Sequence, residues 1–190
     1  MKDFLDTIRQ QHHDAVDGFF AECGDGIAAM AIQVADALAG GKKILLCGNG
    51  GSACDAMHIA GEFVGRYVED RKGLAAIALS ADTGILTAIA NDYDYNYIFA
   101  RQVEALGQAG DVLIALSTSG KSPNVLRAIE SAKQLGMATF LLTGRKALGL
   151  PAAANVTLMV PSVITAHVQE AHATALHAMT CLVEAQLFAK

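Results

Sequence analysis

Hydrophobic residues recur at helical spacing along residues 3 to 39. This apolar stripe consists of Phe4, Ile8, Val16, Phe19, Phe20, Ile27, Met30, Val34 and Leu38. The Cys-Gly-Asp-Gly segment at 23–26 interrupts it, and paired glycines commonly mark a break between periodic segments. The pattern therefore predicts a helical hairpin that turns at 23–26.

From Lys43 onward, short apolar runs alternate with segments of helical periodicity. The runs are KILLCG (43–48), LAAIALS (74–80), DVLIALS (111–117), ATFLLTG (138–144) and VTLMVPS (156–162). Such runs are typical of parallel strands that are buried on both faces. A long helix is expected from about Thr165 to Phe188. We therefore predict one α/β domain over 1–190, with βαβ units and helices on both faces of a parallel sheet.

Composition narrows the classes of function. Hydrophobic residues make up 53% of the chain and charged residues 17%, an apolar surplus that suggests buried subunit contacts. No apolar run is long enough to cross a bilayer, and the first residues do not resemble a secretory signal, so we expect a cytoplasmic protein without a membrane partner. The formal charge of −5, without a basic block, argues against nucleic acid. The four scattered cysteines are expected to be reduced thiols.

Two predicted strands end in turns that suit a phosphate group. The first strand runs into Gly-Asn-Gly-Gly-Ser (48–52) and the third into Ser-Thr-Ser-Gly-Lys-Ser (117–122). In open α/β sheets, ligands bind beyond the carboxyl ends of strands, where the next helix presents free N–H groups. Neither turn is a Walker A or GxGxxG motif. Because serines also serve as helix caps and turn residues, phosphate binding and ordinary capping both remain open.

The helix expected after the first turn carries three titratable residues, Asp55, His58 and Glu62, among apolar neighbours. His58 and Glu62 are four residues apart, so they share a helix face and can reach one ligand or metal. A carboxylate and an imidazole at a phosphate-binding cleft are suited to proton transfer. A core histidine is the alternative interpretation.

The final helix carries Gln169, Glu170, His172 and His177. On an ideal helix, residues eight apart differ in direction by about 80° and residues seven apart by about 20°. Glu170 therefore lines up with His177 better than Gln169 does. Periodicity alone leaves the choice between Gln169 and Glu170 open.

Several segments together resemble a known family. They are CGNGGSACDAMHIAGEFVGRY (47–67), AND (90–92), GDVLIALSTSGKSPNV (110–125), LLTG (141–144) and VQEAHATALH (168–177). In this order and spacing they resemble the sugar isomerase (SIS) domain, and specifically the bacterial phosphoheptose isomerases, from about residue 3 to the end. The resemblance implies a five-stranded sheet of flavodoxin-like order. It also implies isomerisation of sedoheptulose 7-phosphate to D-glycero-D-manno-heptose 7-phosphate, early in lipopolysaccharide synthesis, by a homotetramer with active sites between subunits.

The same resemblance implies roles for individual residues. The phosphate would be held by Ser52, Ser117, Thr118, Ser119 and Ser122. The sugar site would be lined by Asn49, Gly50, Gly51, Glu62, Arg66, Asn91, Asp92 and Gln169. Glu62 would be the general base and His177 the general acid, acting through an enediol. One zinc ion per subunit would be bound by His58, Glu62, Gln169 and His177, which selects Gln169 over Glu170. Since a zinc-bound carboxylate is a poorer base, the two roles of Glu62 compete.

The chain departs from the family pattern at one point. Where many members carry an acidic residue and an arginine before the Gln-Glu pair, this chain has Ile164 and His167. We expect either that His167 replaces the hydrogen bonds of the arginine or that the enzyme accepts another ketose phosphate.

A competing hypothesis is a non-catalytic SIS module that binds a sugar phosphate or the replication initiator protein. The relative of that kind lacks the base and the acid, whereas this chain keeps Glu62 and His177. Their presence favours the isomerase.

Overall fold

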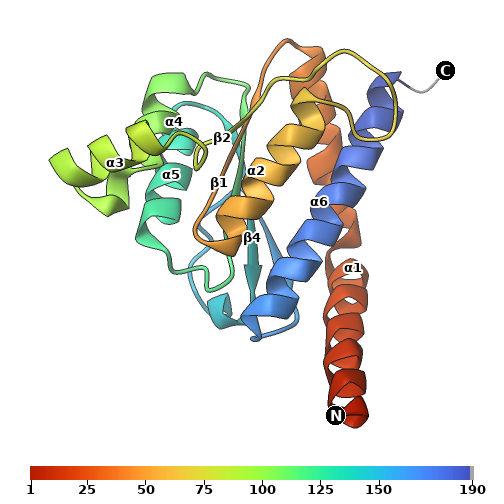
Figure 1. Ribbon diagram of the computed structural model, residues 1–190. Coiled ribbons are helices and arrows are strands. Elements are labelled where there is room, and N and C mark those ends of the chain that lie inside the picture. Colours follow the sequence, from red (N-terminus) through yellow and green to blue (C-terminus); the bar gives the residue numbers. More distant parts are fainter. Residues whose placement is uncertain (189–190) are drawn as a thin grey trace.

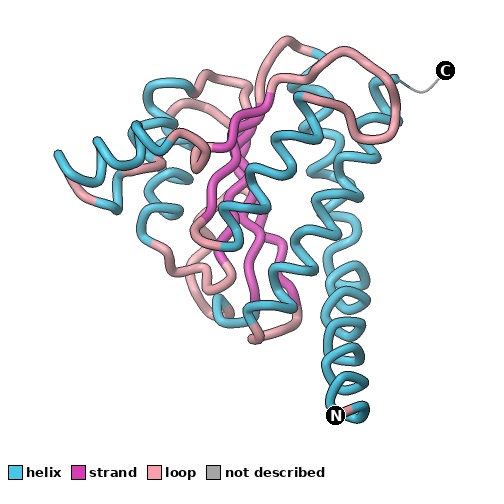
Figure 2. The backbone as a smooth tube through the Cα atoms, in the orientation of Figure 1, coloured by secondary structure: helices cyan, strands magenta, loops and turns pink. Residues whose placement is uncertain are grey.

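Five apolar segments form one parallel sheet in the computed structural model, which describes residues 1–188 (Figures 1 and 2). The strands are β1 (Ile44–Gly48), β2 (Ala76–Ala78), β3 (Val112–Ser117), β4 (Ala138–Gly144) and β5 (Val156–Val160). They pair in the order β2-β1-β3-β4-β5. The predicted strands and the flavodoxin-like order are confirmed, although the edge strand β2 is shorter than the predicted 74–80.

Helices cover both faces of the sheet. They are α1 (Lys2–Ala39), α2 (Gly51–Val64), α3 (Thr83–Asp92), α4 (Ala100–Leu106), α5 (Pro123–Gln134) and α6 (Thr165–Phe188), with short 3-10 turns η1 (Tyr95–Tyr97) and η2 (Arg145–Ala147). Successive strand residues point to opposite faces. Ile44 and Leu46 therefore pack in one core with α1, α2 and α6, while Leu45 and Cys47 pack in the other with α4 and α5.

The predicted N-terminal hairpin is wrong, because α1 is one continuous helix that passes through 23–26. Gly26 is helical and lies so close to the sheet that an added Cβ would stand 2.5 Å from Leu158 Cδ2. This glycine permits close packing and does not mark a turn. Although glycine destabilises a helix interior by about 1 kcal/mol, α1 packs along α6 and against β5, and these contacts offset the propensity.

Two parts of the chain stand away from the sheet. The first turns of α1 project beyond the body of the molecule, with Phe4, Leu5 and Ile8 exposed (Figure 1). The helix α3, on the opposite side of the molecule, contains no buried residue. Within residues 1–188, no helix combines the length and the apolar character needed to cross a bilayer.

Candidate active site

The two turns singled out from the sequence lie side by side at the carboxyl edge of the sheet. They follow the adjacent strands β1 and β3, in which Gly48 is in register with Leu116. Asn49 and Asn124 join the turns through two side-chain hydrogen bonds, each 2.9 Å long. The connections from β1 and β3 leave in opposite directions along the sheet, and such a switch point is where open α/β sheets bind ligands.

The second turn gathers hydroxyl groups at the start of a helix. Ser117 Oγ lies 3.0 Å from Ser122 Oγ, and the backbone N–H of Lys121 donates to Ser119 Oγ at 3.2 Å. Ser122 is the N-cap of α5, and Pro123 is the first helical residue. The hydroxyls therefore lie at the positive end of the α5 dipole, an arrangement suited to a phosphate. Thr118 and Ser119 are half-buried there, and Ser52 is buried in the first turn of α2.

The helices α2 and α6 run alongside each other in the same direction, in contact (Figure 1). Near the start of both, the Gln169 amide fills the space that a Cβ on Gly51 would occupy. Further along, the rings of His58 and His177 meet edge to face with centroids 4.9 Å apart. The packing of α6 against α2 therefore decides which α6 residue lies beside which α2 residue. The periodicity of either helix alone does not determine these pairs.

His58, Glu62 and His177 form the first titratable cluster. His58 Nε2 lies 3.1 Å from Glu62 Oε1. One imidazole nitrogen from each histidine and one oxygen of Glu62 all lie within 4.8 Å of one another. The His58 side chain is 51% exposed and that of Glu62 24%, so the cluster is accessible in the single chain. Two imidazoles and a carboxylate at this separation are a donor set that suits zinc.

The neighbouring residues Gln169 and Glu170 point to different partners. Gln169 lies against Gly51 of α2. Glu170 Oε2 lies 2.7 Å from His12 Nδ1 of α1 and 3.1 Å from His167 Nδ1. The structure therefore brings Gln169 to α2 and gives Glu170 to a second cluster, against the preference of the helical wheel.

Two further residues in contact with the first cluster were assigned no role from the sequence. Tyr67 stacks on His177, with centroids 5.7 Å apart and planes inclined by 15°. Asp55 Oδ2 is buried and has no hydrogen-bond partner within the described residues. Burial raises the pKa of Asp55, although His58 and His177 act in the opposite direction. Asp55 could have been assigned to the cluster from the sequence, because it lies three residues before His58 on the same helix. Tyr67 lies after the end of α2, so helical spacing could not have predicted its contact.

A buried ion pair holds the segment after α2 against α6. The side chains of Arg71 and Glu184 are 2% and 3% exposed, and Arg71 Nε donates to Glu184 Oε1 at 2.7 Å. The same carboxylate accepts the backbone N–H groups of Tyr67, Val68 and Glu69. Burial raises the pKa of Glu184, but these hydrogen bonds outweigh that effect, so its pKa is lowered.

Arg71 also caps the end of α2. Its guanidinium donates to the carbonyl oxygens of Glu62 and Phe63, at 2.8 and 2.7 Å. These carbonyls belong to the last turn of α2, which has no intrahelical partners for them. The ion pair therefore fixes both the turn that bears Glu62 and the tyrosine that stacks on His177.

Three predicted sugar-site residues do not join the first cluster within one chain. Arg66 is exposed and donates to the carbonyl of Val68. Asn91 and Asp92 are exposed at the end of α3 and bond to each other at 2.8 Å. Figure 1 places α3 across the molecule from α6. None of the hydrogen bonds among residues 1–188 links these three side chains to His58, Glu62 or His177.

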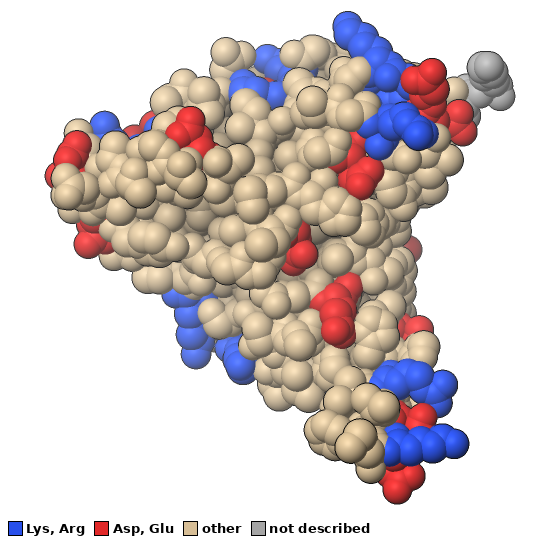
Figure 3. All heavy atoms as spheres, viewed as in Figure 1, with Lys and Arg blue, Asp and Glu red and all other residues tan. Residues whose placement is uncertain are grey.

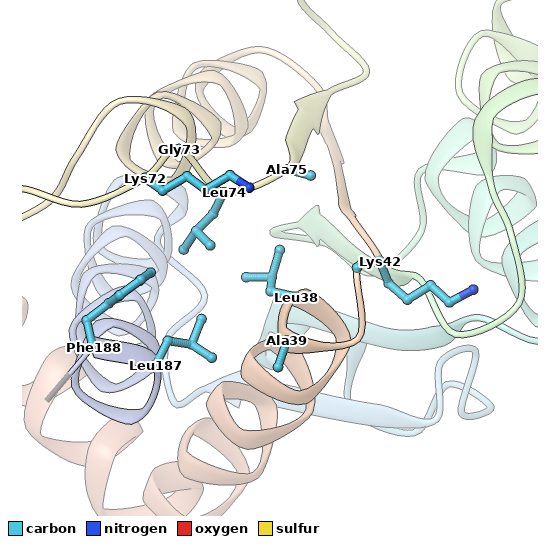
Figure 4. Close-up of a pocket in the computed structure, with 10 residues that line it drawn as sticks. Leu38, Ala39, Lys42, Lys72, Gly73, Leu74, Ala75, Leu187 and Phe188 are labelled. Atoms are coloured by element: carbon cyan, nitrogen blue, oxygen red, sulfur yellow. The ribbon is translucent and has the colours of Figure 1, made fainter.

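The molecular surface and its cavities add two observations. The face that carries α2 and α6 is largely uncharged, with isolated carboxylates along it (Figure 3). A cavity of about 540 Å³ lies elsewhere (Figure 4). Its lining consists of Leu38, Ala39, Gly41, Lys42, Lys72, Gly73, Leu74, Ala75, Leu187 and Phe188. Because Lys42 lies two residues before β1 and Ala75 directly before β2, this cavity opens at the amino edge of the sheet, away from both turns.

Comparisons with known proteins bear on the family of this chain. The SIS domain family model matches residues 9–144. The phosphoheptose isomerase of Desulfovibrio desulfuricans is 48% identical over 187 residues, which cover 97% of this chain and 89% of the relative. The chain belongs to the phosphoheptose isomerase family of SIS-domain proteins.

Solved structures of the phosphoheptose isomerase family share the fold over nearly the whole chain. The enzyme from Neisseria gonorrhoeae superposes with a TM-score of 0.87 at 38% identity and covers 97% of this chain and 98% of its own. The enzyme from Francisella tularensis superposes with a TM-score of 0.85 at 32% identity and covers 96% and 97%. The SIS family model ends at residue 144, so the match over the C-terminal part of the chain rests on these near full-length relatives.

Membership of the phosphoheptose isomerase family, a family of enzymes, also bears on the competing hypothesis. It favours a catalyst over a non-catalytic SIS module. The first cluster accords with this, because it holds a carboxylate and an imidazole within 4.8 Å of each other.

Proposed function

We propose that this chain interconverts sedoheptulose 7-phosphate and D-glycero-D-manno-heptose 7-phosphate, an early step toward the heptose of lipopolysaccharide. The observation that carries the proposal is the meeting of Glu62 and His177, from α2 and α6, in a chain whose two adjacent strand-end turns suit a phosphate. The 48% identity to a phosphoheptose isomerase supports the choice of substrate.

The proposed chemistry is a proton transfer through an enediol. Glu62 removes a proton from C1 of the ketose while His177 donates one to the C2 oxygen, which gives the enediol. Protonation of C2 and loss of the proton on the C1 oxygen then give the aldose. A carboxylate and an imidazole are suited to these steps because each exchanges protons near neutral pH when it is placed in a cleft.

The two turns would anchor the other end of the substrate. Ser52, Ser117, Thr118, Ser119 and Ser122 would bind the phosphate at the starts of α2 and α5. Asn49, Gly50 and Gly51 would line the sugar. Since binding energy at a remote phosphate can position the reacting carbons, these residues serve orientation more than chemistry.

His58, Glu62 and His177 fit a zinc ion. Gln169, whose amide lies against Gly51 on the same pair of helices, is proposed as the fourth ligand. A zinc ion held there would polarise the substrate carbonyl. Glu62 has one oxygen beside His58, and its other oxygen makes no hydrogen bond within residues 1–188. One carboxylate thus has an oxygen for each of its two proposed roles.

We also propose a homotetramer with sites at subunit interfaces. The exposed Phe4, Leu5 and Ile8 at the projecting end of α1 supply apolar surface for such contacts. The exposed Asn91 and Asp92 of α3 would then reach the site of a neighbouring subunit. Sedimentation equilibrium of the wild type tests the assembly, and a monomer at micromolar concentration would contradict it.

The activity is tested by incubating the purified protein with sedoheptulose 7-phosphate in D₂O and following the products by NMR. The enediol route predicts the aldose with deuterium at C2. Absence of conversion with and without added zinc would overturn the proposal and favour the binding module. Running fructose 6-phosphate in parallel tests whether Ile164 and His167 have widened the choice of ketose.

The metal is tested separately by elemental analysis of zinc-loaded protein. His58→Ala and His177→Ala should each lose one zinc per subunit relative to wild type. Full retention of zinc in both variants would refute the ligand assignment while leaving Glu62 and His177 able to transfer protons.

A further inference from the structure

A second cluster of titratable side chains lies between α1 and α6. It contains His12, His167 and Glu170, whose ligand atoms all lie within 4.8 Å of one another. Both histidines direct Nδ1 at the same oxygen, Glu170 Oε2, at 2.7 and 3.1 Å. None of these residues belongs to the first cluster, and the proposed proton transfers use none of them.

The charge of Glu170 has no permanent counterion nearby. Among the described residues its ion pairs are with His12 and His167, and none is with lysine or arginine. Burial raises the pKa of Glu170, but the hydrogen bonds from His167 and His12 outweigh this, so its pKa is lowered. Among the described residues, Glu170 thus meets two imidazoles and no lysine or arginine, a donor set that suits a metal cation.

Two of the three distances between the ligand atoms are close to those of a metal site, and the third is within 4.8 Å. Ligands about 2.0 Å from a tetrahedral zinc ion lie about 3.3 Å from one another. The observed 3.1 Å between His167 and Glu170 is near this value, and the 2.7 Å between His12 and Glu170 needs a small outward movement. The side chains of His12 and Glu170 are 39% and 47% exposed, so they are free to adjust and leave room for a water ligand.

We propose that His12, His167 and Glu170 form a second metal site, which binds a divalent transition-metal ion such as zinc and ties α1 to α6. Imidazole nitrogen and carboxylate oxygen are ligands that zinc and its neighbours accept. His167 is 7% exposed and held by the packing of α6, so it supplies a fixed ligand toward which the other two close. The site shares no residue with the first cluster.

The test compares two adjacent histidines of α1. His12 belongs to the second cluster, whereas His13 is exposed, with its ring centroid 5.8 Å from that of His12, and lies outside the cluster. Full-length wild type, His12→Ala and His13→Ala are loaded with zinc sulfate, freed of unbound metal by gel filtration and analysed for zinc per subunit. His12→Ala should hold one zinc fewer than wild type, and His13→Ala should hold the same amount.

The comparison remains valid whether or not the first cluster binds zinc, because it is a difference between variants. A second measurement uses His58→Ala, in which the first cluster is disabled. Zinc should raise its Tm by several degrees, and the rise should vanish in the His58→Ala, His12→Ala double variant. Equal zinc in His12→Ala and wild type, or a Tm rise that survives in the double variant, would overturn the second metal site and leave a hydrogen-bonded His-Glu-His contact.

Discussion

The molecule contains two clusters of the same composition, each with two histidines and one glutamate, and both use α6. The first, with Glu62, faces α2, and the second, with Glu170, faces α1. The first lies on the helix that follows the glycine-rich turn and is held by the buried Arg71–Glu184 pair. The second is held by contacts at the surface of two long helices. We therefore propose different roles for identical donor groups, because different elements surround them.

The largest difference is expected in catalysis, where Glu62→Gln should lower kcat by about a hundredfold or more. The amide keeps the shape of the side chain but cannot accept the proton. Glu170→Gln is the matched substitution in the second cluster and should change kcat by less than about threefold. Steady-state kinetics with sedoheptulose 7-phosphate measures both. If the two variants lost activity equally, the clusters would act as one catalytic unit.

The buried ion pair that supports the first cluster should contribute much more to stability than an exposed ion pair. Arg71→Ala leaves Glu184 buried without its partner and should lower the free energy of unfolding by about 3–5 kcal/mol. The control is Arg145→Ala, since the Arg145–Glu22 pair is about half exposed and contributes about 1 kcal/mol or less. Urea unfolding of the two variants provides the comparison. A loss below about 1 kcal/mol for Arg71→Ala would show that the loop is held by other contacts.

His172 lies on α6 but belongs to neither cluster, and it should make stability depend on pH. Burial lowers its pKa from 6.5 to about 4, despite its contact with the Thr143 carbonyl. Below pH 6.5 the unfolded chain binds a proton that the folded chain excludes. Stability should therefore be complete above that pH and fall by roughly 1.4 kcal/mol per unit toward pH 4.

Urea unfolding of wild type and His172→Gln between pH 7.5 and 5 tests this dependence. The variant has no imidazole to titrate, so its stability should fall by about 2 kcal/mol less than that of wild type over this range. Parallel curves for the two proteins would mean that His172 is not the group responsible.

The fold was predictable because the pattern that specifies it is local. Each strand lies in a short, mainly apolar run, and the last helix has the predicted limits Thr165–Phe188. The predicted turn at 23–26 was wrong because Gly26 allows close packing against Leu158, a residue far along the chain. The low helix propensity of the glycines suggested a break, but the packing of α1 against α6 and β5 stabilises one continuous helix.

The site was predictable only in part. The spacing of His58 and Glu62 lies within one helix, and the resemblance supplied Gln169 and His177. The helical wheel favoured Glu170 because it compares only the directions of side chains on α6. It contains no information about α1, where His12 contacts Glu170. The Arg71–Glu184 support had no sequence signal, since its partners are 113 residues apart.

The smallest expected effect concerns the hydroxyls of the second turn, which neither cluster touches. Ser119→Ala and Ser122→Ala should each raise KM for the phosphorylated sugar by about tenfold, because each removes a hydrogen bond to a charged group worth roughly 1.5 kcal/mol. The change in kcat should be small, since the phosphate is remote from C1 and C2. Ser131→Ala is the matched control, because Ser131 lies on the same helix α5 but bonds to Glu104 near the other end. If the two turn variants kept the wild-type KM and had a lower kcat, the second turn would take part in the chemistry. The distinction between a turn that binds phosphate and a first cluster that transfers protons would then be wrong.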